Sequence, residues 1–234
     1  MEFPELDALR ALADETRAAE MAAYHKTPRT YLGVSNPQID ALVQVWRAEL
    51  DGNGLDVPDR VDLAARLWQS DVFEARIAAA KLLTQARLRP DDAAWDLIRS
   101  WVPQLDGWAI ADHAMKAADR RLQADPARLD QVETWLEDPN PWVRRAALVA
   151  TLPWTRLRNP KPDELAQRAR LLDWLRRLAD DRDNAIQKAI GSWLRDLSKH
   201  DPQQVRDWLE ADGARLKPVA RSEAGRWLKR QARG

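Results

Sequence analysis

Apolar residues recur along nearly the whole chain with the period of an α-helix, and nowhere do they alternate as in a strand. The run after Pro37 is typical, since Ile39, Leu42, Val43 and Trp46 are spaced i, i+3, i+4, i+7. Glycine is scarce, at 8 of 234 residues, which also favours helices. We therefore predict about twelve helices and no strand, with single helices over residues 4–25 and 216–230.

Three stretches repeat one theme, in which a polar or proline-containing start and a basic residue precede small apolar residues. They are DVFEARIAAAKLL from Asp71, NPWVRRAALVATL from Asn140 and DNAIQKAIGSWL from Asp183. Helix pairs of roughly 35–45 residues cannot bury their own apolar faces, so neighbouring pairs stack. The pattern predicts an all-α, HEAT-like helical-repeat α-solenoid, one domain over residues 1–234, with a hinge at the proline-rich segment 153–163.

The chain carries 37 basic and 37 acidic residues, so its formal net charge is zero. This balance argues against indiscriminate electrostatic adhesion to nucleic acid or membranes. The charges are nevertheless uneven, because residues 140–199 hold thirteen Lys or Arg against seven Asp or Glu, whereas residues 1–20 hold two against six. This asymmetry predicts a basic C-terminal half and favours a concave basic face that binds DNA.

Composition also limits the kinds of active site and the cellular location that we expect. The chain has no cysteine, which excludes disulfides and thiolate chemistry, and its three histidines lie far apart, so we expect no metal and no cofactor. Uncharged runs reach only ten residues and the N-terminus lacks a signal-peptide core, so we expect a soluble cytoplasmic protein without membrane association. Most of the twelve tryptophans are expected in the core, and a few are exposed for a reason.

A predicted helix that starts at Asp106 carries the most specific pair of side chains. Trp108 and Asp112 are four residues apart, so they lie one above the other at the edge of an apolar stripe. An aromatic ring beside a carboxylate can stabilise a positively charged species. The alternative, which the segment alone leaves open, is a core tryptophan and a solvated aspartate. His113 is directed about 100° away from Asp112 around the helix and is interpreted as structural.

Four stretches resemble a known family. They are MAAYHKTPRTYLGV (Met21–Val34), GWAIADHA (Gly107–Ala114), PWVRRAAL (Pro141–Leu148) and IQKAIGSWLRDLSK (Ile186–Lys199). In this order and over essentially the full length, the chain resembles the AlkD-like DNA alkylation repair glycosylases, which are HEAT-like repeat proteins. The resemblance implies excision of cationic N3- and N7-alkylated purines from duplex DNA without base flipping.

The resemblance also assigns residues. It makes Asp112 the catalytic aspartate, Trp108 a tryptophan of the cleft, Arg145 the arginine that grips the duplex and Tyr24 a tyrosine that lines the cleft. Arg144 is the neighbour of Arg145 on the same predicted helix, so its side chain is directed elsewhere, and it is not assigned to DNA.

One position departs from the family pattern. The family's second cleft tryptophan directly follows the IQKAIG motif, where this chain has Ser192. The neighbouring Trp193 falls on the apolar stripe of its helix and is predicted to be core. Ser192 shares the opposite face with Lys188, Arg195 and Lys199, and these four residues are candidates for contact with DNA.

Taken together, these features predict a monofunctional glycosylase that acts as a monomer on double-stranded DNA carrying alkylated bases. Asp112 would stabilise the oxocarbenium-like sugar and orient a water molecule. An alkylated purine is already cationic, so no strong general acid is needed. One alternative is a non-catalytic HEAT-repeat binder of damaged or branched DNA, which Ser192 favours. The other is a protein-binding HEAT scaffold, which the zero net charge favours.

Overall fold

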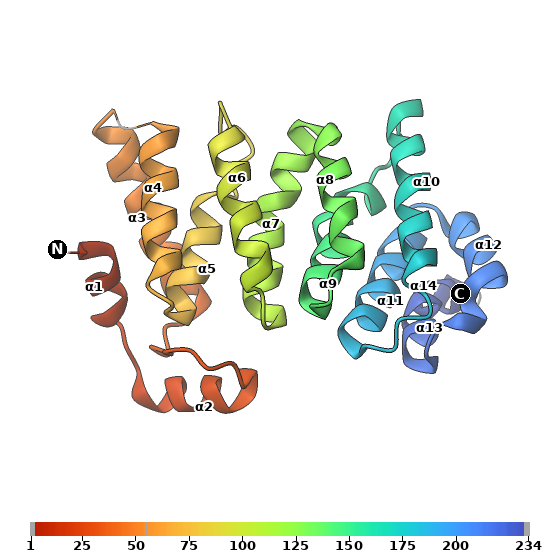
Figure 1. The fold of residues 1–234 in the computed structure, drawn as a ribbon, viewed down its shortest axis with the longest axis horizontal. Helices are drawn as coiled ribbons and strands as arrows, with labels where there is room; N and C mark the ends of the chain where they lie inside the picture. The colour runs from red at the N-terminus through yellow and green to blue at the C-terminus, as the bar shows by residue number, and fades with distance from the viewer. Residues whose placement is uncertain (1–2, 55, 232–234) are drawn as a thin grey trace. The chain divides into compact units, whose positions relative to one another are not determined.

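The computed structural model of the protein describes residues 3–54 and 56–231, which form α-helices joined by short turns (Figure 1). This described part contains fourteen α-helices, five short 3₁₀-helices and no strand, apart from one isolated bridge between Thr30 and Val72. The predicted all-α fold is confirmed. None of the described helices is both long and apolar enough to cross a membrane. The chain divides into two compact units between Ala124 and Asp125.

The first unit is built around α5. Its elements are α1 (Pro4–Arg10), α2 (Glu15–His25), α3 (Asn36–Gly52), α4 (Val57–Gln69), α5 (Phe73–Leu82), α6 (Asp92–Trp101), η1 (Val102–Gln104) and α7 (Trp108–Ala124). Helix α5 packs against α3, α4 and α7, and nine of its ten residues are buried. Four of the nine are alanines, so the neighbouring helices can approach closely. The side chains on α3, α5 and α7 are therefore held in fixed relation to one another.

The prediction of a single helix over residues 4–25 is wrong, because the chain breaks between α1 and α2. The Asp14 carboxylate accepts a hydrogen bond of 2.9 Å from the Arg17 N–H and so caps α2. The backbone N–H of Asp14 donates to the Leu32 carbonyl at 2.8 Å. No residue of α2 is buried, and in Figure 1 this helix lies below the lower end of α5.

The second unit is built around α11. Its elements are η2 (Pro126–Arg128), α8 (Leu129–Glu133), η3 (Thr134–Glu137), α9 (Pro141–Ala150), η4 (Leu152–Thr155), α10 (Pro162–Arg177), α11 (Asn184–Ser198), α12 (Pro202–Asp212), η5 (Gly213–Arg215), α13 (Pro218–Ala224) and α14 (Arg226–Gln231). Helix α11 packs against α9, α12 and α13. A Cβ atom at Gly191 would lie 2.9 Å from the Ala220 carbonyl oxygen, so the close approach of α11 and α13 requires glycine there.

Two other predictions concern the second unit. The predicted single helix over residues 216–230 is wrong, because it divides at Gly225 into α13 and α14; glycine is a weak helix former. The segment 153–163 lies inside the second unit, where Trp154 and Thr155 are buried. The hinge proposed for that segment stays a prediction.

Most of the tryptophans are in the core, as predicted. Eight of them are buried: Trp46, Trp68, Trp95, Trp101, Trp154, Trp174, Trp193 and Trp208. Trp108 is an exception, with 45% of its surface exposed.

Candidate functional site

Tyr24 and Trp108, which the sequence assigns to the site, lie together on the surface of the first unit. Tyr24 belongs to the last turn of α2 and Trp108 is the first residue of α7. Their ring centroids are 6.3 Å apart and the rings are nearly perpendicular, at 89°. Tyr24 is 69% exposed. Two accessible aromatic rings from distant parts of the sequence thus form one surface on which a base or a sugar can rest.

Three further aromatic side chains support this pair from within the unit. The His25 ring lies 5.5 Å from Trp108 and 4.7 Å from Phe73, centroid to centroid. Tyr31 stacks on Phe73 at 4.7 Å, and Phe73 is buried. Burial lowers the pKa of His25, although the Glu74 carboxylate opposes this shift. His25 is therefore a neutral aromatic support at physiological pH.

Helix α7 places Asp112 one turn beyond Trp108 on the same face, as predicted. Asp112 is half-buried. The apolar stripe predicted for this helix is buried throughout: Ile110, Ala111, Ala114, Ala118 and Leu122. That stripe fixes the rotation of α7 about its axis and so directs Trp108 and Asp112 away from the core.

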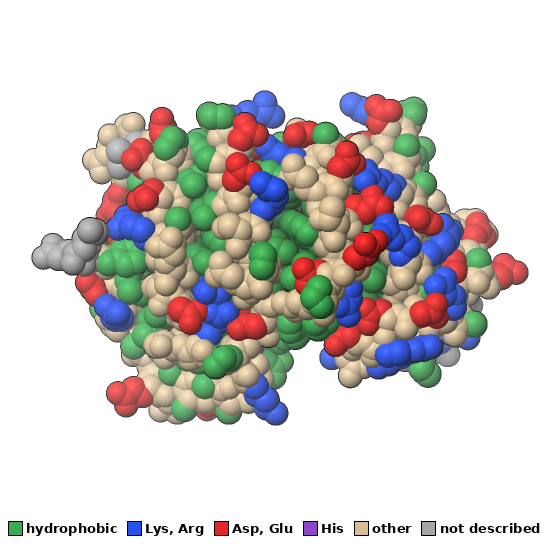
Figure 2. All heavy atoms as spheres, viewed as in Figure 1, with side chains coloured by type: hydrophobic (Ala, Val, Ile, Leu, Met, Phe, Trp, Pro, Cys, Tyr) green, Lys and Arg blue, Asp and Glu red, His purple; other side chains and the backbone are tan. Residues whose placement is uncertain are grey.

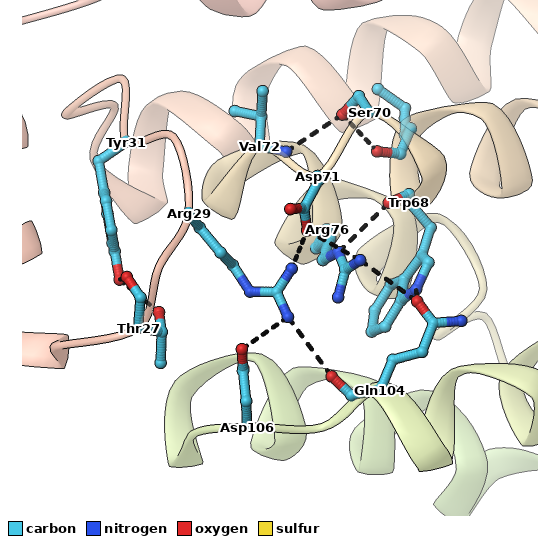
Figure 3. Close-up of polar contacts among 11 residues, drawn as sticks. Thr27, Arg29, Tyr31, Trp68, Ser70, Asp71, Val72, Arg76, Gln104 and Asp106 are labelled. Carbon is cyan, nitrogen blue, oxygen red and sulfur yellow. Dashed lines mark hydrogen bonds and ion pairs between the residues drawn. The ribbon is translucent and has the colours of Figure 1, made fainter.

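Arg29 connects the two segments that carry the aromatic pair (Figure 3). Its guanidinium forms ion pairs with Asp71 and, at 2.8 Å, with Asp106, and it donates to the Gln104 carbonyl at 3.4 Å. The Arg29 side chain is only 7% exposed. Arg29 follows α2 and Asp106 precedes α7, so this contact holds Trp108 in place relative to Tyr24.

A second arginine, Arg76 on α5, belongs to the same network of polar contacts. It pairs with Asp71 at 2.9 Å and donates to the Trp68 carbonyl and the Gln104 side chain, each at 3.2 Å. Its guanidinium also lies 4.6 Å from the centre of the Trp68 ring. Asp71 has a left-handed backbone, with φ of 56°, which is uncommon for a residue other than glycine. Two arginines on its carboxylate stabilise this turn.

A buried carboxylate anchors the connection between α2 and α3. Glu74 is fully buried and accepts hydrogen bonds from the backbone N–H groups of Leu32, Gly33 and Val34, at 3.0, 2.7 and 3.3 Å. At Gly33, φ is 76° and a Cβ atom would lie 2.2 Å from the Asp14 carbonyl oxygen, so only glycine fits. Although α2 buries no residue of its own, these contacts fix both of its ends.

The other predicted site residues belong to the second unit, where the two adjacent arginines of α9 have different surroundings. Arg144 pairs with Asp181 at 2.8 Å and donates to the Asp138 carbonyl at 2.7 Å, so its role is structural. The guanidinium of Arg145 lies 5.9 Å from the centre of the Trp142 ring and is half-buried.

Helix α11 confirms the predicted position of Trp193. That side chain is fully buried, and its Nε1–H donates to the Thr151 hydroxyl at 3.2 Å. Ser192 is half-buried and Lys188 is exposed. Trp193 is therefore a core residue, as predicted, and the cleft role that the resemblance implies for position 192 stays a prediction.

Arg195 and Lys199 are less available than the sequence suggests. The Asp196 carboxylate accepts hydrogen bonds from Arg195 at 3.1 Å and from Lys199 at 2.7 Å, and Arg195 also pairs with Glu223. Burial raises the pKa of Asp196, but the two cations outweigh it and hold that pKa below its ordinary value. Contact of Lys188, Ser192, Arg195 and Lys199 with DNA stays a prediction.

Many basic residues of the second unit form ion pairs, several of them with carboxylates that lie outside residues 140–199. Figure 2 shows acidic and basic side chains interleaved over α10 and α12. Helix α10 accounts for several of these pairs: Arg170 with Asp130 and Glu133, Arg176 with Asp212, and Arg177 with Glu133 and Glu137. The excess counted over residues 140–199 is therefore partly offset by carboxylates outside that stretch.

Sequence reasoning missed Arg29 and Glu74, which position the site without belonging to its surface. Glu74 carried a usable signal, because a carboxylate within the alanine-rich run of a core helix is buried only when its oxygens are satisfied. Arg29 lies inside the stretch that resembles the family, but its two partners are distant in sequence. Nothing in its spacing indicates them.

The fold and the site together define a class of protein. It is an all-helical repeat protein in which an exposed tryptophan and a carboxylate lie one turn apart on the same helix, with an exposed tyrosine next to the tryptophan. A family model described as "DNA alkylation repair enzyme" matches residues 6–228. The chain belongs to the DNA alkylation repair enzyme family, whose partner is DNA.

Solved structures resemble the fold. A predicted DNA alkylation repair enzyme from Enterococcus faecalis is 24% identical, with a TM-score of 0.76 over 92% of this chain and 96% of that one. AlkD2 from Streptococcus mutans is 24% identical, with a TM-score of 0.58 over 77% and 86%. The smu.31 protein from Streptococcus mutans UA159 is 23% identical, with a TM-score of 0.58 over 80% and 95%. No curated protein matches the chain.

Proposed function

We propose that the protein is a monofunctional DNA glycosylase. It hydrolyses the N-glycosidic bond of cationic N3- and N7-alkylated purines in duplex DNA, as a monomer and without base flipping. The observation that carries this proposal is the surface of the first unit, where exposed Tyr24 and Trp108 lie beside Asp112. Membership in the DNA alkylation repair enzyme family gives that surface its substrate class.

The chemistry requires one carboxylate and a water molecule. As the glycosidic bond breaks, the cationic base leaves with the bonding electron pair and becomes neutral, while positive charge develops on the sugar. Asp112 stabilises this oxocarbenium-like sugar and orients water toward the anomeric carbon. The water then loses a proton to the carboxylate or the solvent. The leaving group needs no protonation, so no second acidic group is required.

The aromatic pair recognises the positive charge of the lesion. Trp108 and Tyr24 present ring faces that attract a cation, and Trp108 is one helical turn from Asp112. Because both rings are exposed, a duplex can meet them at the surface without a nucleotide entering an enclosed pocket. This accessibility supports excision without base flipping.

A second function has one observation in its favour. Ser192 stands where the resemblance implies a second cleft tryptophan, and Trp193 is buried in the core. A relative that has lost one aromatic wall can bind damaged or branched DNA without catalysing excision. The protein-binding scaffold, by contrast, has no such observation beyond the net charge.

The test is release of the base from a duplex that contains a single N7-methylguanine, with enzyme in excess over DNA. The proposal predicts abasic sites, revealed by alkaline strand cleavage, above the spontaneous rate and absent from the unmodified duplex. Binding of the methylated duplex without any release would establish the non-catalytic alternative. Failure to bind duplex DNA at low salt would favour the protein scaffold.

A further inference from the structure

A small basic pocket opens on the first unit and is lined by His113, the residue that follows Asp112 on α7. It has a volume of about 190 Å³ and lies between α3, α5 and α7. The residues that line it are Asp40, Val43, Gln44, Arg47, Lys81, Thr84, His113 and Lys116. Three of them are permanent cations and one is a carboxylate, so the pocket carries a net positive charge.

The cations of this pocket retain unused hydrogen-bonding capacity. Arg47 donates one N–H to the Lys81 carbonyl, while its Nε is buried with no hydrogen-bond partner. Lys81 pairs with Asp40 at 2.5 Å. Lys116 is exposed and forms no ion pair within the described part of the chain. An anion with several oxygens would satisfy donors that the protein leaves open.

The pKa of His113, which lines the pocket, depends on its burial and on the charges around it. Burial, together with Lys81 and Lys116, lowers the pKa of His113 to about 4, although Asp112 and Asp40 oppose the shift. Burial is the largest cause of this shift, and the two lysines add to it. His113 is therefore neutral at physiological pH and lies beside a positive site.

The pocket continues a line of functional side chains along α7. Trp108, Asp112 and Lys116 are spaced i, i+4, i+8, so they follow one another on one face in steps of about 6 Å. The order along the helix is therefore the exposed tryptophan, the carboxylate and then the lysine of the basic pocket. A DNA strand that places a sugar against Asp112 would bring an adjoining phosphate toward Lys116.

We propose that this pocket binds a backbone phosphodiester of the DNA strand that carries the lesion, through Arg47, Lys81 and Lys116. The inference rests on the proposed function and adds to it the group that positions the strand on Asp112. A phosphate contact fixes register without reading sequence. It therefore suits an enzyme that must act in any sequence context.

Phosphate binding has a consequence for pH. The charged groups that face His113 are Asp40 and Arg47 from α3, Lys81 from α5, and Asp112 and Lys116 from α7. A phosphate among them offsets the cations and raises the pKa of His113 above its value of about 4 in the free protein. Because the complex then binds a proton more tightly than the free protein, affinity for DNA rises as the pH falls through the pKa of the complex.

The experiment compares Lys116→Gln with a control, Arg99→Gln, in the full-length chain. Arg99 lies on α6, outside the pocket, and pairs with Asp96 at 2.8 Å in an exposed contact. Affinity for an undamaged duplex is measured against salt concentration, and the imidazole of His113 is titrated by NMR with and without the duplex. The chain has only three histidines, and exposed His200 in the second unit serves as the internal reference.

The proposal predicts that the duplex raises the pKa of His113, and that Lys116→Gln makes the salt dependence of log affinity shallower by about one unit. Arg99→Gln leaves that slope unchanged. If the wild type binds the duplex while the His113 titration and the Lys116→Gln slope do not move, the pocket does not hold phosphate and the proposed function stands. If the wild type does not bind the duplex at all, the proposed function fails, and this inference fails with it.

Discussion

Two aromatic residues of the first unit are exposed at a cost to stability. Burying a large aromatic side chain contributes about 2–3 kcal/mol, and Tyr24 and Trp108 give up much of that gain. Each contacts the ring of His25, which in turn packs against the buried ring of Phe73. An exposed but fixed ring loses little conformational entropy when it meets a ligand. This arrangement is the property expected of a recognition surface.

Ser192 tests whether a lost aromatic side chain limits activity. Position 192 lies off the buried stripe of α11, so Ser192→Trp need not overpack the core. If the new ring contacts the cationic lesion, it adds roughly 0.5–2 kcal/mol of cation–π interaction, and excision rises by up to about thirtyfold. Single-turnover rates on N7-methylguanine DNA measure the effect. The gain must disappear in the Asp112→Asn background; an equal gain there would mean that the tryptophan acts outside the proposed site.

Helix α2 shows which features of a helix can be predicted from the sequence and which cannot. Periodicity predicted helix on both sides of Asp14 but not the break between them, because the apolar spacing continues through it. The connection that follows α2 is held by two sets of contacts. Its backbone donates hydrogen bonds to Glu74 of α5, and its Arg29 pairs with Asp71 before α5 and with Asp106 before α7. Such long-range polar contacts leave no local pattern. The helices were therefore predictable, and the device that positions Tyr24 against Trp108 was not.

Arg29→Met tests this positioning role. The substitution keeps the apolar stem but removes the charge between Asp71 and Asp106, both of which are partly exposed. We expect a loss of about 1–3 kcal/mol in the free energy of unfolding, measured by urea denaturation. Excision should fall more than DNA affinity, because Trp108 is misplaced while the phosphate contacts remain.

The control is Arg99→Met, which removes an exposed i,i+3 ion pair on α6 and should change stability by less than about 0.5 kcal/mol. Equal effects of the two substitutions on excision would show that Arg29 has no special role in the site.

Across the whole molecule, sequence and structure agree on fold class and family, and the structure adds how the charges are paired. The helical-repeat pattern and the four matching stretches were visible in the sequence, and the core tryptophans followed from periodicity. Charge counting indicated a basic C-terminal half, yet in the structure Arg144, Arg195 and Lys199 are already paired with carboxylates. Ion pairs between helices depend on packing, which a linear count does not contain.

Substitutions of Arg145 and of its neighbour Arg144 form a matched pair that tests whether the second unit contributes to DNA binding. Arg145→Ala should weaken binding to all sequences alike and make the salt dependence of log affinity shallower by about one unit. Arg144→Ala removes the ion pair with Asp181, so it should lower thermal stability and leave the salt dependence nearly unchanged. Identical salt slopes for Arg145→Ala and the wild type would assign Arg145 to structure.

The central claim is that Asp112 stabilises charge in the excision reaction, and Asp112→Asn tests it most directly. The substitution keeps the size of the side chain and removes its charge. Single-turnover release of N7-methylguanine should fall about 10–1000-fold, since one electrostatic stabiliser contributes a few kcal/mol, while melting temperature and affinity for the methylated duplex stay close to those of the wild type. Retention of the wild-type release rate by Asp112→Asn, with DNA binding intact, would contradict the account.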